Sequence, residues 1–235
     1  MASGAVGKAR SGPPEAVGKA GGELGPAPGE AGRAAAPGVL TRRAERLLRS
    51  PTRVRRGVLW LFATGAGYAA VIAVLAWGGD RPGSFAPWLR IPDETYFWWE
   101  AVFIGPVIVA GGLLAATVVY LLARTAGGGG GFDDTLALTG PAVAFGTAFT
   151  LVPDLVVGLL LVTHVLDVEA WMTGITTASL TLALVWAYQL AYVAAFLVAF
   201  ALVVRTAHGL PRRWAALVGL TGFVLYQGFL FVFIR

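Results

Sequence analysis

The chain alternates between long apolar stretches and short polar connections. The apolar stretches cover about residues 57–77, 99–122, 134–152, 174–204 and 214–234. Each is long enough for a helix of the roughly 20 residues that cross a bilayer, and the helix of the second stretch is expected to begin earlier, near Asp93. This pattern predicts an all-α fold: a polytopic integral membrane protein with a five-helix transmembrane bundle.

The basic residues set the number and the orientation of the spans. A further apolar stretch, 155–165, is too short to cross a membrane, and we interpret it as an extension of the third span or as a re-entrant segment. With five spans and an internal amino terminus, all 18 basic residues except Arg81, Arg90 and Arg235 lie on the inner side. The positive-inside rule then predicts the amino terminus inside and the carboxy terminus outside. The protein is expected to be integral to a membrane, the cell membrane if its source is prokaryotic.

Two regions precede the membrane domain, which is predicted at 57–235. Residues 1–38 are rich in glycine, alanine and proline and contain no aromatic residue, so they predict a disordered tail. Residues 39–56 are rich in arginine and predict a basic amphipathic segment next to the membrane.

The basic segment places Ala44, Leu47 and Leu48 on one face of a short helix, which Pro51 should end. Its arginines suit an anionic lipid leaflet or a protein partner, and a simple positive-inside anchor is the alternative. The arginines concerned are Arg42, Arg43, Arg46, Arg49, Arg53, Arg55 and Arg56.

Composition excludes an ordinary soluble enzyme. Hydrophobic residues make up 57% of the chain and charged residues only 13%, about half the charged share of a soluble domain. The chain has no cysteine and two histidines, and it contains no Gly-x-Ser-x-Gly motif. We therefore expect a protein that is not an enzyme, with no cofactor, no metal site and no nucleic-acid partner.

Small residues recur at every fourth position of the fourth span, at Ser179, Ala183, Ala187, Ala191, Ala195 and Ala199. Small residues allow helices to pack closely in lipid. Shorter series occur in the second, third and fifth spans, for example Gly111 and Ala115 in the second. The pattern predicts a tightly packed bundle with the fourth span near its centre, and the alternative is a seam between two copies of the chain.

A glycine-rich turn separates the second and third predicted spans. Gly127 to Gly131 precede Phe132, Asp133 and Asp134. We expect a tight turn, in which valine at Gly128 and Gly130 would impair folding if positive φ is required there, with Asp133 or Asp134 capping the third span. A partner-binding loop is the alternative interpretation.

Ionisable residues inside the predicted spans are few. Asp154 comes directly after Pro153, and because proline breaks a helix we expect Asp154 to cap the next segment at the external interface. The alternative is a buried carboxylate with a function. Glu100 comes after Trp98 and Trp99 at the start of the second span and is expected to face the external headgroups.

Several segments together resemble the Yip domain family in its prokaryotic branch. They are the basic LLRSP, the I-P-x-E-x-Y segment, LLARTAGG followed by GGGFDDTLALTG, TLVPDL and RTAHGLPRRWAAL. The resemblance covers about 47–235 and implies five helices and a cytoplasmic amino terminus. Eukaryotic members of the family bind Rab-type GTPases, whereas the role of prokaryotic members is generally unassigned.

The function expected from the sequence is a non-enzymatic membrane scaffold that binds partners at its cytoplasmic faces. The alternative is a small-solute or ion permease that uses Asp154. The candidate functional or partner-binding residues are Gly128, Gly130, Phe132, Asp133, Asp134, Pro153 and Asp154. The protein partner is unknown, and a homo-oligomer through the small residues of the fourth span is an open alternative.

Overall fold

The computed structural model describes residues 45–80, 91–177 and 179–233. The predictions for the tail at 1–38 and for Arg42 and Arg43 lie outside these ranges. The described residues belong to one compact unit. They form one helical turn at 45–48 and then six helices, and this described part contains no strand.

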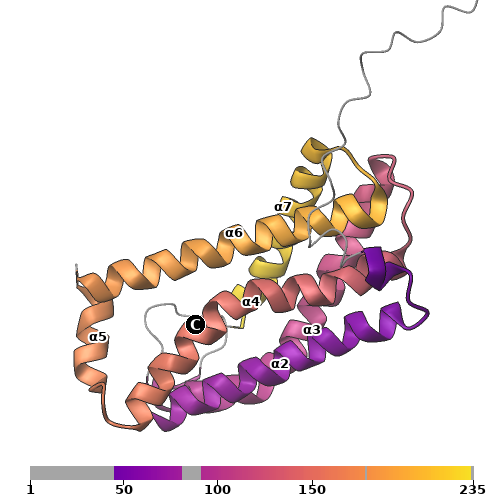
Figure 1. The fold of residues 1–235 in the computed structure, drawn as a ribbon. Coiled ribbons are helices and arrows are strands. Elements are labelled where there is room, and N and C mark those ends of the chain that lie inside the picture. The colour runs from indigo at the N-terminus through magenta and orange to yellow at the C-terminus, as the bar shows by residue number, and fades with distance from the viewer. Residues whose placement is uncertain (1–44, 81–90, 178, 234–235) are drawn as a thin grey trace, which may run out of the picture. The chain divides into compact units, whose positions relative to one another are not determined.

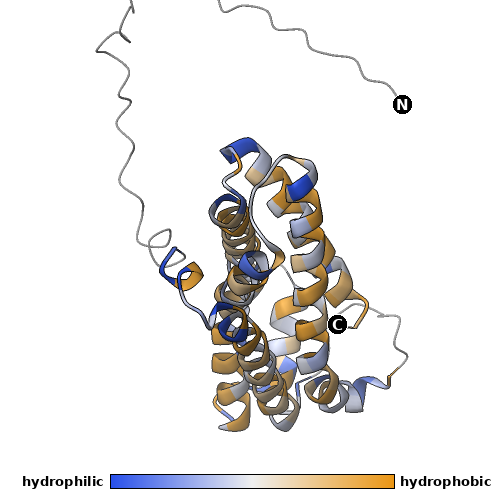
Figure 2. Ribbon diagram, turned by 90° about the vertical axis from the view of Figure 1, so that its right-hand side faces the viewer, coloured by the Kyte–Doolittle hydropathy of each residue, from blue (hydrophilic) through white to orange (hydrophobic). Residues whose placement is uncertain are grey.

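Five of the six helices are long and apolar enough to cross a membrane, which confirms the all-α fold with five candidate spans. Many large apolar side chains along them are exposed, mainly leucine, valine, phenylalanine and tryptophan, and Figure 2 shows hydrophobic residues along most of the length of the helices. The helices are α2 (Arg53–Trp77), α3 (Asp93–Thr125), α4 (Phe132–Val162), α5 (Val168–Thr176), α6 (Leu180–His208) and α7 (Arg212–Phe231).

The helix boundaries settle the two alternatives for the short apolar stretch at 155–165. Helix α4 continues without interruption to Val162, so most of the stretch extends the third span and is not a re-entrant segment. The fourth predicted stretch, 174–204, contains the end of one helix and most of another. The nine-residue α5, whose side chains are not buried, runs from the end of α4 to the start of α6 (Figure 1).

The five long helices pack in a closed ring in the order α2, α4, α6, α7 and α3, with α3 returning to α2. Helix α3 also contacts α4 and α6 across the ring, so it touches all four other spans. Helices α2 and α6 share no substantial contact. The prediction that the fourth span lies near the centre is therefore wrong, because α3 contacts every other span whereas α6 does not pack on α2.

Small residues produce the closest approaches within this ring, but only part of the predicted series in α6 takes part. Ala195 and Ala199 are buried, whereas Ala183 and Ala187 are exposed because α6 extends beyond its neighbours toward α5. Helices α2 and α3 meet backbone to backbone, since a Cβ added to Gly65 would lie 2.9 Å from the Cα of Gly105. Lipid provides no hydrophobic driving force for the association of helices, so such close contacts help to hold the bundle together.

The two ends of the bundle differ in charge. Every arginine among the described residues lies where α2, α4 and α7 begin and where α3 and α6 end, and we call this the basic end. The opposite end, which carries Asp80, Glu94 and Glu169, has no described arginine. This asymmetry matches the distribution of basic residues along the sequence that orients the chain.

Candidate functional site

The glycine turn packs against the carboxy-terminal end of α6 at the basic end. The backbone N–H of Gly129 donates to the carbonyl of His208 at 3.2 Å, and that of Gly128 donates to the carbonyl of Ala123 at 2.8 Å. A Cβ at Gly128 would lie 2.8 Å from the Cβ of His208, and one at Gly130 would overlap the backbone of Ala207. The glycines are therefore needed for close contact.

The expected positive φ falls on a different glycine. Gly127, the first of the run, has φ +85°, whereas Gly128 and Gly130 do not lie in the left-handed region. Positive φ is therefore not the reason for glycine at Gly128 and Gly130, because the chain reverses at Gly127, immediately after the last turn of α3. The other two glycines then run along α6, where side chains would collide.

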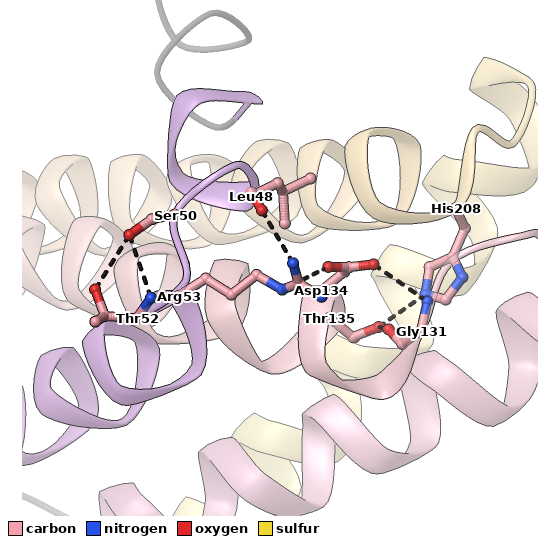
Figure 3. Close-up of polar contacts among 8 residues, drawn as sticks. All are labelled: Leu48, Ser50, Thr52, Arg53, Gly131, Asp134, Thr135 and His208. Carbon is pink, nitrogen blue, oxygen red and sulfur yellow. Dashed lines mark hydrogen bonds and ion pairs between the residues drawn. The ribbon is translucent and has the colours of Figure 1, made fainter.

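Asp134 joins the start of α4 to the start of α2 (Figure 3). Its carboxylate pairs with the Arg53 guanidinium at 3.0 Å and accepts from the backbone N–H of Gly131 at 3.4 Å. Asp134 therefore caps α4 from within the first turn, in accord with the prediction for one of the two carboxylates. Asp133 is exposed. Arg53 also donates to the carbonyl of Leu48 at 3.2 Å.

His208 is a buried residue that no sequence pattern singles out. Its Nε2 lies 2.8 Å from the hydroxyl of Thr135, and the imidazole is 5% exposed (Figure 3). The ring of Phe132 packs on Tyr120 at 5.8 Å, beside the same histidine. The basic end is thus a joint between α2, α3, α4 and α6, which favours the structural interpretation of the glycine turn.

The basic segment is attached to this joint. Leu47 and Leu48 pack against a small apolar cluster that α4 and α6 form, with Leu138 and Val203 among its members. The turn at 45–48 ends before Pro51, in accord with the predicted helix stop. Arg53 is half-buried, whereas the other described arginines of the segment are exposed: Arg46, Arg49, Arg55 and Arg56.

Pro153 and Asp154 lie inside α4, and neither ends a helix. The helix runs through both residues to Val162, which places Asp154 about 12 Å from the helix end at a rise of 1.5 Å per residue. The prediction that Asp154 caps a following segment is therefore wrong. A membrane helix accommodates proline because neighbouring groups satisfy the carbonyl that it frees.

Glu100 faces the interior of the bundle, which corrects the expectation that it meets the external headgroups. Its side chain is 1% exposed, and neither carboxyl oxygen has a hydrogen-bond partner among the described residues. It lies seven residues into α3, about 10 Å from the helix start. The neighbouring Trp98 and Trp99, by contrast, are exposed by 52% and 56%.

Helical periodicity is the signal that could have placed Glu100 correctly. Tyr96 and Ile104, four residues before and after it, are fully buried, and Gly111 lies eleven residues further along the same face. Residues at these spacings share one side of a helix. Glu100 therefore belongs to the packing face of α3 and not to the aromatic belt.

The interior polar cluster consists of Glu100, Asp154 and the tyrosines around them. Asp154 lies within electrostatic range of Glu100, and Tyr68 of α2 lies within electrostatic range of both carboxyl groups. On the α6 side, Tyr188 lies next to Asp154. Tyr226 in α7 also lies within electrostatic range of Tyr68, and its buried hydroxyl lies beside Thr147 of α4.

All five spans therefore contribute a polar side chain to one region of the interior. An ionised carboxylate without a partner is costly in an apolar medium, so such a group stays neutral or holds a cation. Two neighbouring carboxyl groups and several hydroxyls can exchange a proton or a small cation. One turn deeper, the hydroxyl of Tyr192 donates to Oε1 of Gln227 at 2.7 Å and links α6 to α7.

Comparisons with known proteins do not identify a function for this chain. No family model, no curated protein and no solved structure matches the chain. The function is therefore inferred from the two sites described above, the joint at the basic end and the interior polar cluster.

Proposed function

We propose that this protein is a membrane permease that takes up a proton or a small cation at Glu100 and Asp154. The observation that carries the proposal is Glu100, a fully buried carboxyl group whose two oxygens have no partner among the described residues. Ionisable groups at this depth in a membrane protein are rare and mark ion pathways and proton relays. An unpartnered carboxyl group lowers stability, so a function that uses it accounts for its presence.

The position of Asp154 agrees with a path from one side of the bundle. Asp80 lies at the end of α2 and acts electrostatically on Asp154, and Asp154 in turn acts on Glu100. Asp154 is half-buried, whereas Glu100 is buried. The three carboxyl groups thus pass from the end opposite the arginines into the interior. The positive-inside rule makes that end the external one, which for a prokaryotic source faces away from the cytoplasm.

Flux measured in proteoliposomes tests the proposal. Purified protein is reconstituted with a pH-sensitive dye inside, and a proton gradient is imposed. We expect dye-reported flux with the wild type, loss of flux in Glu100→Gln and Asp154→Asn, and unchanged flux in Glu169→Gln, which removes a carboxylate of α5 that is not buried. Absence of flux for protons, sodium and potassium in folded wild-type protein would refute the proposal.

A non-enzymatic scaffold is the second candidate, and the attached basic segment favours it. Leu47 and Leu48 hold the segment against α4 and α6, and its arginines lie at a fixed place. An anionic surface, whether lipid or protein, would bind there. The Yip family resemblance stays a prediction and is compatible with both candidates. Recovery of a specific partner that depends on Arg46 and Arg49, together with absent flux, would favour the scaffold.

A further inference from the structure

We infer that a groove on the lipid-facing side of α2 and α3 binds one acyl chain of an anionic phospholipid, whose headgroup lies at Arg55. The groove has a volume of about 510 Å³ and is lined almost entirely by apolar atoms. Its lining includes Phe62, Ala66 and Ala69 from α2 and Ala101, Gly105 and Leu113 from α3.

The groove exists because its floor is made of two glycines. Gly65 and Gly105 bring the backbones of α2 and α3 into contact, since a Cβ at Gly65 would lie 2.9 Å from the Cα of Gly105. No side chain rises from the floor, and Ala66 and Ala69 supply only methyl groups to one wall. The exposed Phe62 and Leu113 form higher edges. A narrow apolar channel with raised edges fits a hydrocarbon chain.

The position of the groove within the membrane determines which molecule can occupy it. Both helices are candidate membrane spans, and the lining residues of α2 lie in its middle third, so the groove faces hydrocarbon. Lipid tails are therefore the molecules at highest local concentration. Burial of an acyl chain here removes no water, so selectivity must come from shape and from the headgroup.

Charge along the groove orients the lipid. Arg55 lies 7, 11 and 14 residues before Phe62, Ala66 and Ala69, so it is on the same face of α2, about 10 Å beyond Phe62 at 1.5 Å per residue. It is exposed at the basic end. At the opposite end, Glu94 is exposed and lies seven residues before Ala101, on the groove face of α3.

An anionic headgroup is therefore attracted at one end of the groove and repelled at the other. The Arg55 guanidinium is not held inside the protein, because Arg53 makes the ion pair with Asp134 while Arg55 is exposed. A phosphodiester accepts two parallel hydrogen bonds from a guanidinium. The site thus selects phosphatidylglycerol-like lipids over phosphatidylcholine by charge.

Photo-crosslinking tests the site directly. The full chain is reconstituted in nanodiscs of phosphatidylcholine that contain phosphatidylglycerol with a diazirine on one acyl chain, and labelled peptides are identified by mass spectrometry. We expect labels to concentrate at 62–69 and 101–113. Ala66→Phe should fill the groove and lower this labelling several-fold, whereas Leu217→Phe, which enlarges an exposed side chain of α7, should leave it unchanged.

The headgroup is tested with matched arginine variants. Arg55→Gln should lower labelling by phosphatidylglycerol about fivefold, the equivalent of about 1 kcal/mol, and should not affect the weaker labelling by a diazirine phosphatidylcholine. Arg213→Gln, which removes an exposed arginine of α7 at the same end, should leave both unchanged. Equal labelling by the two lipids would refute the role of Arg55.

Two other outcomes would overturn the site itself. Labels spread evenly over all exposed helix faces would show a general lipid shell without a specific groove. Crosslinks between two copies of the chain at 62–69 would show that a second copy occupies the groove in place of a lipid. Folding of Ala66→Phe is checked by its elution volume and tryptophan fluorescence, and Ala69→Phe provides a second variant of the same wall.

Discussion

Replacement of Glu100 by leucine should stabilise the protein while it abolishes flux. In the wild type, a carboxyl group that is 1% exposed lacks a hydrogen-bond partner among the described residues. Mutational data place the cost of such a group at about 1–3 kcal/mol. Leucine has a similar volume and no polar atom, so it removes this cost without leaving a large cavity.

The expected gain lies at the lower half of that range. Polar interactions inside membrane proteins contribute less than in apolar solvents, because the unfolded chain in the membrane also finds partners for its polar groups. We therefore expect Glu100→Leu to raise the free energy of unfolding by about 1–2 kcal/mol. Glu100→Gln should change it little, because glutamine keeps a polar group without a partner at the same place.

Reversible unfolding in mixed micelles provides the measurement. Sodium dodecyl sulfate is titrated into protein in a mild detergent, and tryptophan fluorescence reports the folded fraction. A gain of 1.4 kcal/mol multiplies the ratio of folded to unfolded protein by about ten. If Glu100→Leu instead lowers stability, Glu100 has a partner in the folded protein and the reasoning on its burial fails. Higher stability with lost flux is the combination expected when a functional site is strained.

Two further predictions concern the basic end and the orientation of the chain. Gly130→Ala should lower the free energy of unfolding by about 2–3 kcal/mol, because its Cβ would overlap the backbone of Ala207. Gly129→Ala is the control and should be neutral, because no atom lies within 4 Å of its Cβ. Equal effects of the two variants in the same titration would contradict the packing role of Gly130. The chain has no cysteine, so single cysteines can be introduced to report its topology. A cysteine at Gly129 should react with impermeant maleimide added on the inner side, and one at Asp167 with maleimide added on the outer side. Labelling of both from the same side would refute the five-span topology.

The membrane fold was largely predictable, because hydropathy over about 20 residues is a strong signal and the arginines lie at one end. Local helix-breaking rules were less reliable. Pro153 is a residue at which such rules end a helix, but α4 continues for nine more residues to Val162. The rules hold in water, which can hydrogen-bond to the backbone N–H and C=O groups that the end of a helix leaves free. In the apolar interior of a membrane there is no such water, so the backbone stays helical to satisfy most of these groups.

The candidate site was predictable only in part. Asp154 stands out because charge is rare in a span, but its depth depends on the course of α4. The tryptophans before Glu100 favour the interface, although the helical face that includes Gly111 indicates burial. The contact between His208 and Thr135, which are 73 residues apart, depends on how α6 returns beside α4, and no local pattern encodes it.

The closed order of the five spans has a consequence for biosynthesis. Among the five spans, α7 leaves the ribosome after the other four, yet it fills the place between α6 and α3. Until it arrives, Phe200 and the Gly111 face of α3 lack the cover that Tyr226 and Phe229 provide, and Phe196 keeps its contact with Gly146 of α4. Four inserted helices therefore form an open arc that other membrane proteins or lipids can enter. A quality-control protease that recognises uncovered helix faces would act in this interval, and a chain that lacks α7 would remain its substrate.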